Sequence, residues 1–335
     1  MTTVSRGSTH RITLAKGLNA GLRKAMEDDP KVLVMGEDVG TLGGVFRITD
    51  GLQKDFGEDR VIDTPLAEAG ILGTAVGLAI RGYRPVCEIQ FDGFVYPAYD
   101  QIVSQVAKIH FRSQGRVKMP IVVRIPFGGG IGAVEHHSES PEAQFAHTPG
   151  LKVVSCSNPV DGYWMIQQAI KCDDPVIFLE PKRLYHADKA ELDETVTPAP
   201  LFSSRVVRAG TDVTLLSYGP MVKTCLASAE AAAGSEGSVS IEVIDLRTLS
   251  PLDMGPVHES VRKTGRAVVV HEAHVNLGLG SEVAARITEE CFYSLEAPVL
   301  RVGGFDTPYP PSRMEEHWLP DLDRVLDAVD RTLAY

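Results

Sequence analysis

Cysteine is scarce in this sequence, and its five cysteines never form a Cys-x-x-Cys pair. They stand at Cys87, Cys156, Cys172, Cys225 and Cys291. Thiols that are so widely spread and odd in number predict neither a disulfide framework nor a zinc site. They suit a reducing compartment.

Positive charge is also in short supply, with 33 lysines and arginines against 44 acidic residues and a net charge of −11. A diffuse acidic surface repels phosphate backbones, so a nucleic acid is not an expected partner. No stretch approaches the ~20 apolar residues of a membrane helix, and the first residues contain no apolar run of the signal-peptide type. We therefore expect a cytoplasmic protein without a membrane segment.

What the sequence does have is the composition of an ordinary globular protein, 44% hydrophobic and 23% charged over 335 residues. That length has room for two domains with sizeable cores. Short apolar runs alternate with helical patterns, which predicts parallel sheets covered by helices on both faces. The first apolar runs are 32–36, 61–63, 86–91, 121–126, 151–155 and 175–181, with helices expected over 11–29, 94–112 and 160–172.

The alternation of apolar runs and helical patterns stops after residue 181 and resumes later, which divides the apolar runs into two series. The next two dozen residues lose the alternation and carry acidic residues, two prolines and polar filler, so 186–205 is the expected linker. We predict an α/β fold with two parallel-sheet domains, at 1–185 and 206–335. The second series comprises VTLLSYG, SIEVIDL, RAVVVHE and PVLRVGG, followed by the amphipathic tail DLDRVLDAVDRTLAY.

Two glycine-rich turns, at 125–134 and 276–287, follow strand-like runs. Neither is a sound dinucleotide fingerprint, because Val283 replaces the third glycine of the second turn and no suitably placed acidic strand end follows. The sequence also has no GxxxxGK[ST] motif. We interpret both as tight turns at strand ends rather than as phosphate sites.

Glu68 is the only charged residue between Asp63 and Arg81, at the start of a helix too apolar to be fully exposed. A carboxylate there costs several kcal/mol unless it is paired or protonated. Two interpretations stay open. One is a first-turn glutamate favoured by the helix dipole; the other is a carboxyl group with a raised pKa that shares a proton with a ligand's ring nitrogen.

The stretch HHSESPEAQFAHTPG, residues 136–150, gathers titratable and hydroxyl side chains. The ligands of a zinc site would be His136, His137, Glu142 and His147. Their spacing is not that of HExxH and a proline interrupts it, which disfavours a metal. A serine nucleophile is disfavoured too, since neither serine lies in a GxSxG motif. A proton-transferring histidine and a solvated loop remain, and the position after a strand favours function.

Five segments, in this order, are similar to the beta subunit of the thiamine-diphosphate-dependent 2-oxoacid dehydrogenases, over essentially the whole chain. They are MGEDVGTLGGVFRITDGL, DTPLAEAGILGTAVGLA, EIQFDGFVYPAYDQIVSQVAK, HHSESPEAQFAHTPGLKVV and PVIFLEPKRLY. The resemblance implies a pyrimidine-binding α/β domain of the thiamine type, followed by a transketolase C-terminal domain.

The resemblance also implies a thiamine diphosphate site. Glu68 matches the glutamate that hydrogen-bonds the aminopyrimidine ring and so helps to activate the cofactor. Phe94 matches the aromatic residue that stacks on this ring. Gln90 and Leu66 match neighbouring positions of the pocket, and Glu37 resembles an acidic position near the cofactor.

His137, directly before Ser-x-Ser, matches the family's active-site histidine. That histidine serves proton transfer while the acyl group passes to lipoamide. The resemblance thus makes Glu68 and His137 the catalytic residues. Glu139 is a departure, because a glutamine is expected there; it adds a carboxylate close to the histidine.

One motif of the thiamine enzymes is missing. Asp-Gly begins at Asp50, Asp92 and Asp161, but it never occurs as Gly-Asp-Gly, the motif that binds the diphosphate through Mg²⁺. The resemblance therefore implies no metal ligands in this chain and an alpha subunit that carries the motif, in an α₂β₂ heterotetramer. It also implies docking of the lipoyl acyltransferase core, mainly on the C-terminal surface.

The substrate is less defined. The segments QFDGFVYPAYDQ and HSESPEA resemble the branched-chain 2-oxoacid enzymes more than the pyruvate enzymes, with pyruvate and acetoin as alternatives. A catalytically silent scaffold subunit is the alternative of another class, which the joint presence of Glu68, Phe94 and His137 disfavours. A self-sufficient transketolase-like enzyme is a further rival, which the missing Gly-Asp-Gly motif disfavours.

Overall fold

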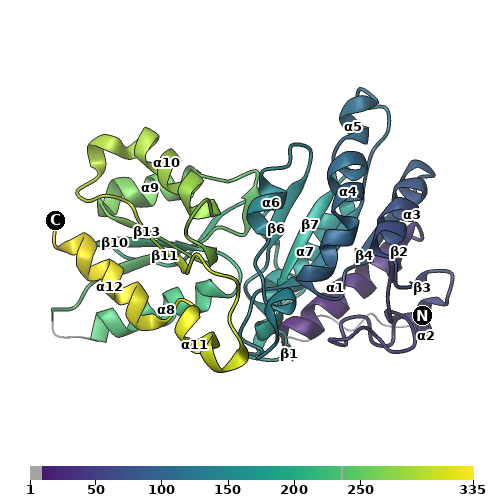
Figure 1. Cartoon of the computed structure of the whole chain (residues 1–335), viewed down its shortest axis with the longest axis horizontal. Coiled ribbons are helices and arrows are strands. Elements are labelled where there is room, and N and C mark those ends of the chain that lie inside the picture. Colours follow the sequence, from purple (N-terminus) through teal and green to yellow (C-terminus); the bar gives the residue numbers. More distant parts are fainter. Residues whose placement is uncertain (1–9, 235–236) are drawn as a thin grey trace.

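The computed structural model describes residues 10–234 and 237–335, so the first nine residues of the domain predicted over 1–185 lie outside it. Over the described ranges, the strands form a seven-stranded sheet, a five-stranded sheet and a two-stranded ladder. Figure 1 shows the two large sheets side by side, each between layers of helices. The predicted α/β class with two mainly parallel sheets is confirmed.

The first sheet has the strand order β12-β6-β7-β5-β4-β2-β3. Its parallel strands are β2 (Val32–Gly36), β3 (Val61–Asp63), β4 (Arg84–Glu88), β5 (Val122–Phe127), β6 (Lys152–Ser155) and β7 (Val176–Pro181). Each coincides within a few residues with a predicted apolar run, because a strand covered on both faces needs apolar side chains on both. At one edge, β12 (Thr248–Ser250) pairs antiparallel with β6.

Helices cover both faces of this sheet. On one face, α1 (Leu14–Asp28) and α7 (Pro159–Lys171) pack on each other and on the strands. Both start at a side chain that accepts a backbone N–H of the first turn, Thr13 for α1 and Asn158 for α7. On the other face, α3 (Glu68–Ile80) packs beside the segment that follows β4.

The single helix predicted around 94–112 is wrong. The chain instead forms a 3-10 helix, η1 (Asp92–Ala98), then α4 (Tyr99–Gln101), a π-helical turn, η2 (Ile102–Val106), and α5 (Ile109–Arg112). Pro97 lies inside η1, and a proline has no N–H for a regular helical bond. Such irregular turns often mark functional regions, and this one contains Phe94.

The second sheet has the strand order β14-β13-β10-β11-β9, with β9 antiparallel to the others. Its strands are β9 (Arg205–Arg208), β10 (Val213–Ser217), β11 (Ile241–Asp245), β13 (Ala267–His274) and β14 (Leu300–Gly304). One face packs on α8 (Met221–Gly234) and α12 (Leu322–Leu333), and the other on α9 (Gly255–Thr264) and α10 (Leu279–Cys291).

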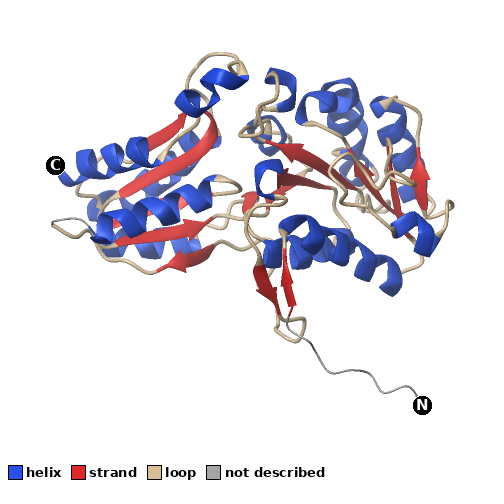
Figure 2. Ribbon diagram, turned by 90° about the horizontal axis from the view of Figure 1, so that it is seen from below, coloured by secondary structure: helices blue, strands red, loops and turns tan. Residues whose placement is uncertain are grey.

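The two predicted domains share structural elements. The strand β12 comes from the predicted second domain but extends the first sheet. Within the predicted linker, β8 (Ala190–Leu192) pairs with β1 (His10–Ile12), in the ladder that Figure 2 shows apart from both large sheets. One hydrophobic core extends from Ile71 in α3 to Ile287 in α10. The junction between the domains is therefore packed.

Short helical segments complete the fold. They are α2 (Leu52–Phe56), η3 (Glu135–His137), α6 (Glu142–Ala146), η4 (Lys182–Leu184), η5 (Phe292–Ser294), η6 (Ser312–Met314) and α11 (Glu315–Trp318). In the part of the chain that the structure describes, no helix has the length and apolarity needed to cross a membrane. The turn η3, between β5 and α6, is the one that carries His137.

Candidate active site

The residues predicted for the site follow four neighbouring parallel strands. Glu37 follows β2, Leu66 and Glu68 follow β3, Gln90 and Phe94 follow β4, and His137 follows β5. These strands are adjacent in the order β5-β4-β2-β3. The carboxyl ends of parallel strands meet at one edge of a sheet, which is where α/β proteins bind ligands. The fold therefore gathers all six residues at one edge.

Glu37 and Glu68 lie close enough for their charges to interact. Burial raises the pKa of Glu37, and the negative charges of Glu68 and Asp38 raise it further. The Oε1 atom of Glu37 is buried and has no hydrogen-bond partner among the described residues. Gln90, which follows β4, connects to the segment after β2. Its Nε2 donates to the Glu37 carbonyl (3.3 Å) and to the Asp38 carboxylate (3.0 Å). An unused buried acceptor in such a place suits a polar ligand.

Glu68 is the first residue of α3, and only 8% of it is exposed. The following turns are apolar, and Ile71 and Leu72 are buried in the core, so packing fixes the start of the helix. The amides of a first turn also favour a carboxylate. Glu68 is thus a nearly buried first-turn carboxyl group, and its role as a proton-sharing group stays a prediction. Leu66, just before it, is 80% exposed and belongs to the surface of this chain.

His137 and Phe94 belong to one aromatic cluster with Phe91. The ring of His137 lies 4.0 Å from that of Phe91 and 5.1 Å from that of Phe94, measured between centroids. Helix α3 packs against η1, and η1 packs against η3. Phe94 therefore lies in the element between those that carry Glu68 and His137. Sequence reasoning missed Phe91, although the motif QFDGF places two phenylalanines three residues apart.

A buried ion pair between Asp92 and Lys182 supports the histidine turn. The second oxygen of Asp92 accepts the amide of Glu139 at 2.7 Å, and the Glu139 carboxylate accepts the hydroxyl of Tyr96 at 2.9 Å. Burial raises the pKa of Asp92 to about 6, although the charge of Lys182 lowers it. Sequence reasoning missed Asp92 and Lys182. The available signal in the sequence was a charged residue directly after each of two apolar runs, 86–91 and 175–181.

Other polar residues of the histidine stretch are placed elsewhere. Glu142 opens α6, and its buried carboxyl group accepts a hydrogen bond at 2.5 Å from Tyr218, the residue after β10. His136 pairs with Glu135 at 3.6 Å, and His147 is exposed. Among the described residues, no group of three or more His, Cys, Asp or Glu side chains could hold a metal ion. The residues of the zinc alternative therefore do not form one site.

Comparison with known proteins places this chain in a family. The model of the transketolase pyrimidine binding domain matches residues 10–187, and that of the transketolase C-terminal domain matches residues 203–325. The pyruvate dehydrogenase E1 component subunit beta of Leifsonia xyli is 60% identical over 324 residues, which cover 97% of this chain and 95% of that one. The chain belongs to the E1 beta subunits of the 2-oxoacid dehydrogenases.

Other relatives of this E1 beta subunit differ in their substrate names. The 3-methyl-2-oxobutanoate dehydrogenase subunit beta of Mycobacterium tuberculosis is 55% identical over 325 residues, 97% of this chain and 93% of that one. A solved split-gene transketolase, described as an inactive beta4 tetramer, has a TM-score of 0.77 and 21% identity, covering 97% of this chain and 99% of that one. At that identity, the likeness shows the fold alone.

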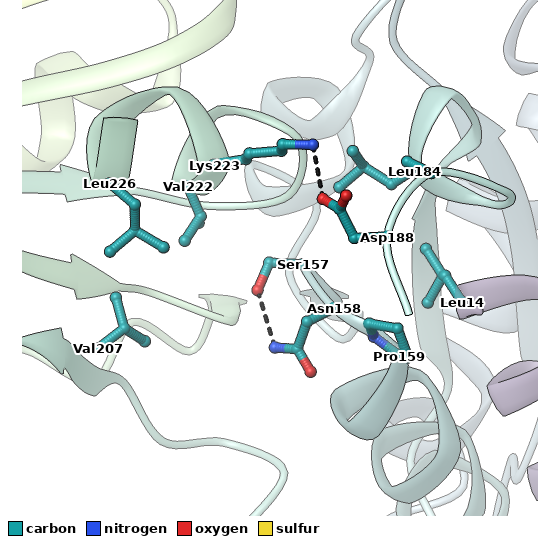
Figure 3. A pocket seen from close by; sticks show the side chains of 11 residues that line it. Leu14, Ser157, Asn158, Pro159, Leu184, Asp188, Val207, Val222, Lys223 and Leu226 are labelled. Carbon is teal, nitrogen blue, oxygen red and sulfur yellow. Dashed lines mark hydrogen bonds and ion pairs between the residues drawn. The ribbon is translucent and has the colours of Figure 1, made fainter. Parts of the chain in front are cut away.

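The E1 beta subunit also has a cavity of about 310 Å³ between its two domains. Its walls are mainly aliphatic, and the Lys223 ammonium and the Asp188 carboxylate form an ion pair there at 2.5 Å (Figure 3). The aliphatic side chains are Leu14, Leu184, Val207, Val222 and Leu226. The lining, all of it within the described residues, includes none of the six residues at the sheet edge. This cavity is distinct from the candidate active site.

Proposed function

We propose that this E1 beta subunit contributes the pyrimidine half of a thiamine diphosphate site in a 2-oxoacid dehydrogenase. The observation that supports this most directly is the nearly buried Glu68 at the carboxyl edge of the sheet, within electrostatic reach of Glu37. A carboxyl group in such surroundings can share a proton with a ring nitrogen. The Oε1 of Glu37, which has no hydrogen-bond partner in the described part of the chain, offers the same ligand a second polar atom.

Thiamine diphosphate, when bound, supplies a carbon nucleophile for the 2-oxo group and accepts the electron pair that CO₂ leaves behind. This chain would bind the aminopyrimidine ring of the cofactor and hold a proton at its ring nitrogen. Glu68 would hydrogen-bond the ring nitrogen, and Phe94 would cover one ring face. Leu66 and Gln90 would border the pocket. The Glu37 carbonyl and the Asp38 carboxylate hold the side-chain amide of Gln90 in place.

The metal half of the site is assigned to a partner alpha subunit. This sequence has no Gly-Asp-Gly motif, so Mg²⁺ and the diphosphate would be held mainly by the partner. The exposed Leu66 lies two residues from Glu68, and such an apolar surface beside a polar site suits a covering subunit. The cofactor would then lie at the α/β interface of an α₂β₂ heterotetramer.

His137 is the proposed proton-transfer residue for passage of the acyl group to lipoamide. Its Nδ1 lies 2.9 Å from the carbonyl oxygen of His136. A proton on Nδ1 satisfies that carbonyl and leaves Nε2 as the atom that exchanges a proton. Stacking on Phe91 fixes the ring plane, which a directed proton transfer needs.

The second domain offers a surface for the lipoyl acyltransferase core. Phe292, Tyr293 and Tyr335 are exposed aromatic side chains, and two of them, Phe292 and Tyr335, line a groove with Leu295 and Pro298. Exposed aromatic groups of this kind are typical of protein interfaces. We assign docking of the core mainly to this C-terminal surface.

For the substrate, we propose branched-chain 2-oxo acids. The segments QFDGFVYPAYDQ and HSESPEA support this class, and the relative with 55% identity is named for one such acid. Pyruvate is the second candidate, because the relative with 60% identity is named for it. The two differ by the size of the aliphatic group, so a hydrophobic pocket discriminates them by differences in kcat/KM.

The test is the 2-oxoacid-dependent reduction of an artificial acceptor by this chain co-purified with its alpha partner. The 2-oxo acids of valine, leucine and isoleucine are compared with pyruvate. Higher kcat/KM for the branched acids is the expected result, and higher kcat/KM for pyruvate would assign the second candidate. A complex that forms but turns over no 2-oxo acid would reject the enzymatic function in favour of a scaffold subunit.

A further inference from the structure

The backbone amides of the glycine-rich loop after β5 are occupied by carboxylates from the second half of the chain. The amides of Gly130 and Gly132 donate to the two oxygens of Glu315, at 2.7 and 3.0 Å. The amide of Gly129 donates to Glu272. Successive amides of this kind form a cradle for an anion, and here the protein's own side chains fill it. This arrangement agrees with a tight turn rather than a phosphate site.

Tyr309 completes these contacts. Its hydroxyl donates to Glu315 at 2.5 Å and accepts the amide of Gly130 at 3.3 Å. A Cβ built on Gly129 would overlap the Tyr309 hydroxyl, and Gly130 has a φ of +86°, which side chains rarely adopt. Glycines at these two positions therefore allow Tyr309 to approach the backbone of the loop so closely. We call Glu272, Tyr309 and Glu315 the loop clamp.

The clamped loop leads directly into the turn of His137. The amide of Gly128, at the start of the loop, donates to the carbonyl of Glu139 at 2.8 Å, so the loop and the histidine turn close on each other. The backbone of this closed segment is fastened at Glu139 by Asp92 and at the glycines by the loop clamp. The position of His137, which lies between these anchors, depends on both.

We propose that Glu315 is a positioning residue for His137 and thereby controls acyl transfer to lipoamide. The proposal rests on the proposed function, since acyl transfer is the step assigned to His137. Glu315 is nearly buried and holds two loop amides at once, so its loss would let the loop relax. A misplacement of about 1 Å can slow a directed reaction about 100-fold. Glu68 follows a different strand, β3, so decarboxylation would be spared.

Variants of the assembled enzyme separate positioning from folding. Glu315→Ala removes both acceptor oxygens, Glu315→Gln keeps one, and Tyr309→Phe keeps the ring without the hydroxyl. Glu316→Gln is the matched control, because Glu316 is the exposed neighbour in the same short helix. Each variant is assayed for 2-oxoacid-dependent reduction of an artificial acceptor and for acylation of a lipoylated domain.

Acylation should fall about 10- to 100-fold in Glu315→Ala and less in Glu315→Gln and Tyr309→Phe. Acceptor reduction should stay within about twofold of wild type in all of them. The ratio of the two rates is the decisive readout, since a general loss of folded enzyme lowers both equally. An unchanged ratio in Glu315→Ala would overturn the proposal. If that variant does not fold, an unchanged ratio in both Glu315→Gln and Tyr309→Phe would do so.

Hydrogen exchange of the peptides spanning residues 128–140 separates this proposal from the proposed function. Exchange should be faster in Glu315→Ala than in wild type and in Glu316→Gln. If the wild-type complex turns over no 2-oxo acid, the proposed function fails and exchange still decides whether Glu315 fixes the histidine loop. Unchanged exchange in Glu315→Ala would reject the positioning role.

Discussion

The imidazole of His137 stacks on the ring of Phe91, with planes only 13° apart. Phe91 is followed by Asp92, which is paired with Lys182 and accepts the amide of Glu139. One short segment after β4 therefore supplies both the ring against His137 and the anchor for the backbone that follows it. The orientation of His137 therefore depends on tertiary contacts as well as on the hydrogen bond within its own turn.

Replacing Glu68 by Gln should lower the rate of 2-oxo acid decarboxylation about 100-fold or more in the complex with the alpha subunit, because an amide cannot share a proton with a ring nitrogen. The measurement is single-turnover decarboxylation with saturating thiamine diphosphate. Glu58→Gln is the control, since Glu58 is exposed in the turn that precedes β3. A near-normal rate in Glu68→Gln would remove Glu68 from the mechanism.

His137→Ala should slow acylation of a lipoylated domain about 100-fold and leave thiamine diphosphate affinity close to that of wild type. The physical reason is that His137 follows β5 and stacks on Phe91, whereas Glu37 and Glu68 follow β2 and β3. The control is His147→Ala, an exposed histidine of the same stretch. Loss of cofactor affinity with normal acylation at saturation would contradict the assignment.

Glu142 should make stability depend on pH, because burial raises its pKa from 4.5 to about 7 even though Tyr218 donates a hydrogen bond to it. Between these values the folded protein keeps the proton and the unfolded chain loses it. The folded state is therefore progressively destabilised as the pH rises from about 4.5 to 7, by about 3 kcal/mol in total.

Glu142→Gln removes the titratable carboxyl group. The apparent Tm of the variant, relative to that of the wild type, should therefore increase between pH 5 and pH 8. Thermal unfolding of both proteins across that range measures the difference. Glu230→Gln, at an exposed position in α8, should show a constant difference. A constant difference for Glu142→Gln as well would show that Glu142 does not carry a raised pKa.

Arg124→Leu should destabilise the protein by about 3–5 kcal/mol, because it leaves two buried carboxylates without their cation. The guanidinium lies between Glu88, at 2.6 Å, and Glu180, at 2.7 Å, and all three side chains are buried. Urea unfolding provides the measurement, with Arg116→Leu at an exposed position as the control. A loss below about 1 kcal/mol would show that the carboxylates find other partners or protons.

The parallel strands of the first sheet could be predicted because both of their faces are covered. The runs at 32–36 and 61–63 coincide with β2 and β3 residue for residue. The segment at 94–112 could not be predicted in the same way. Its apolar spacing is helical, but Pro97 and the π-helical turn break the regular hydrogen bonding. The three-residue β12 is defined only by its antiparallel pairing with β6 across the domain border.

The site features likewise divide into those that the local sequence reveals and those that only the tertiary structure reveals. Glu68 was detectable as a lone charge in an apolar helix, and His137 was identified through its resemblance to a family motif. The contact between Gly129 and Glu272 joins residues 143 positions apart, and nothing in either local sequence marks the pairing. Local patterns predict which groups are unusual, whereas tertiary structure determines what they touch.

The central claim is that this chain supplies only the pyrimidine half of a shared cofactor site. The most direct test is calorimetric titration of thiamine diphosphate with Mg²⁺ into this chain alone, into the complex with the alpha subunit, and into the complex carrying Glu68→Gln. Tight binding should require the complex, and the wild-type complex should then decarboxylate 2-oxo acids while the Glu68→Gln complex does not. Tight, stoichiometric binding by this chain alone, with turnover, would contradict the account.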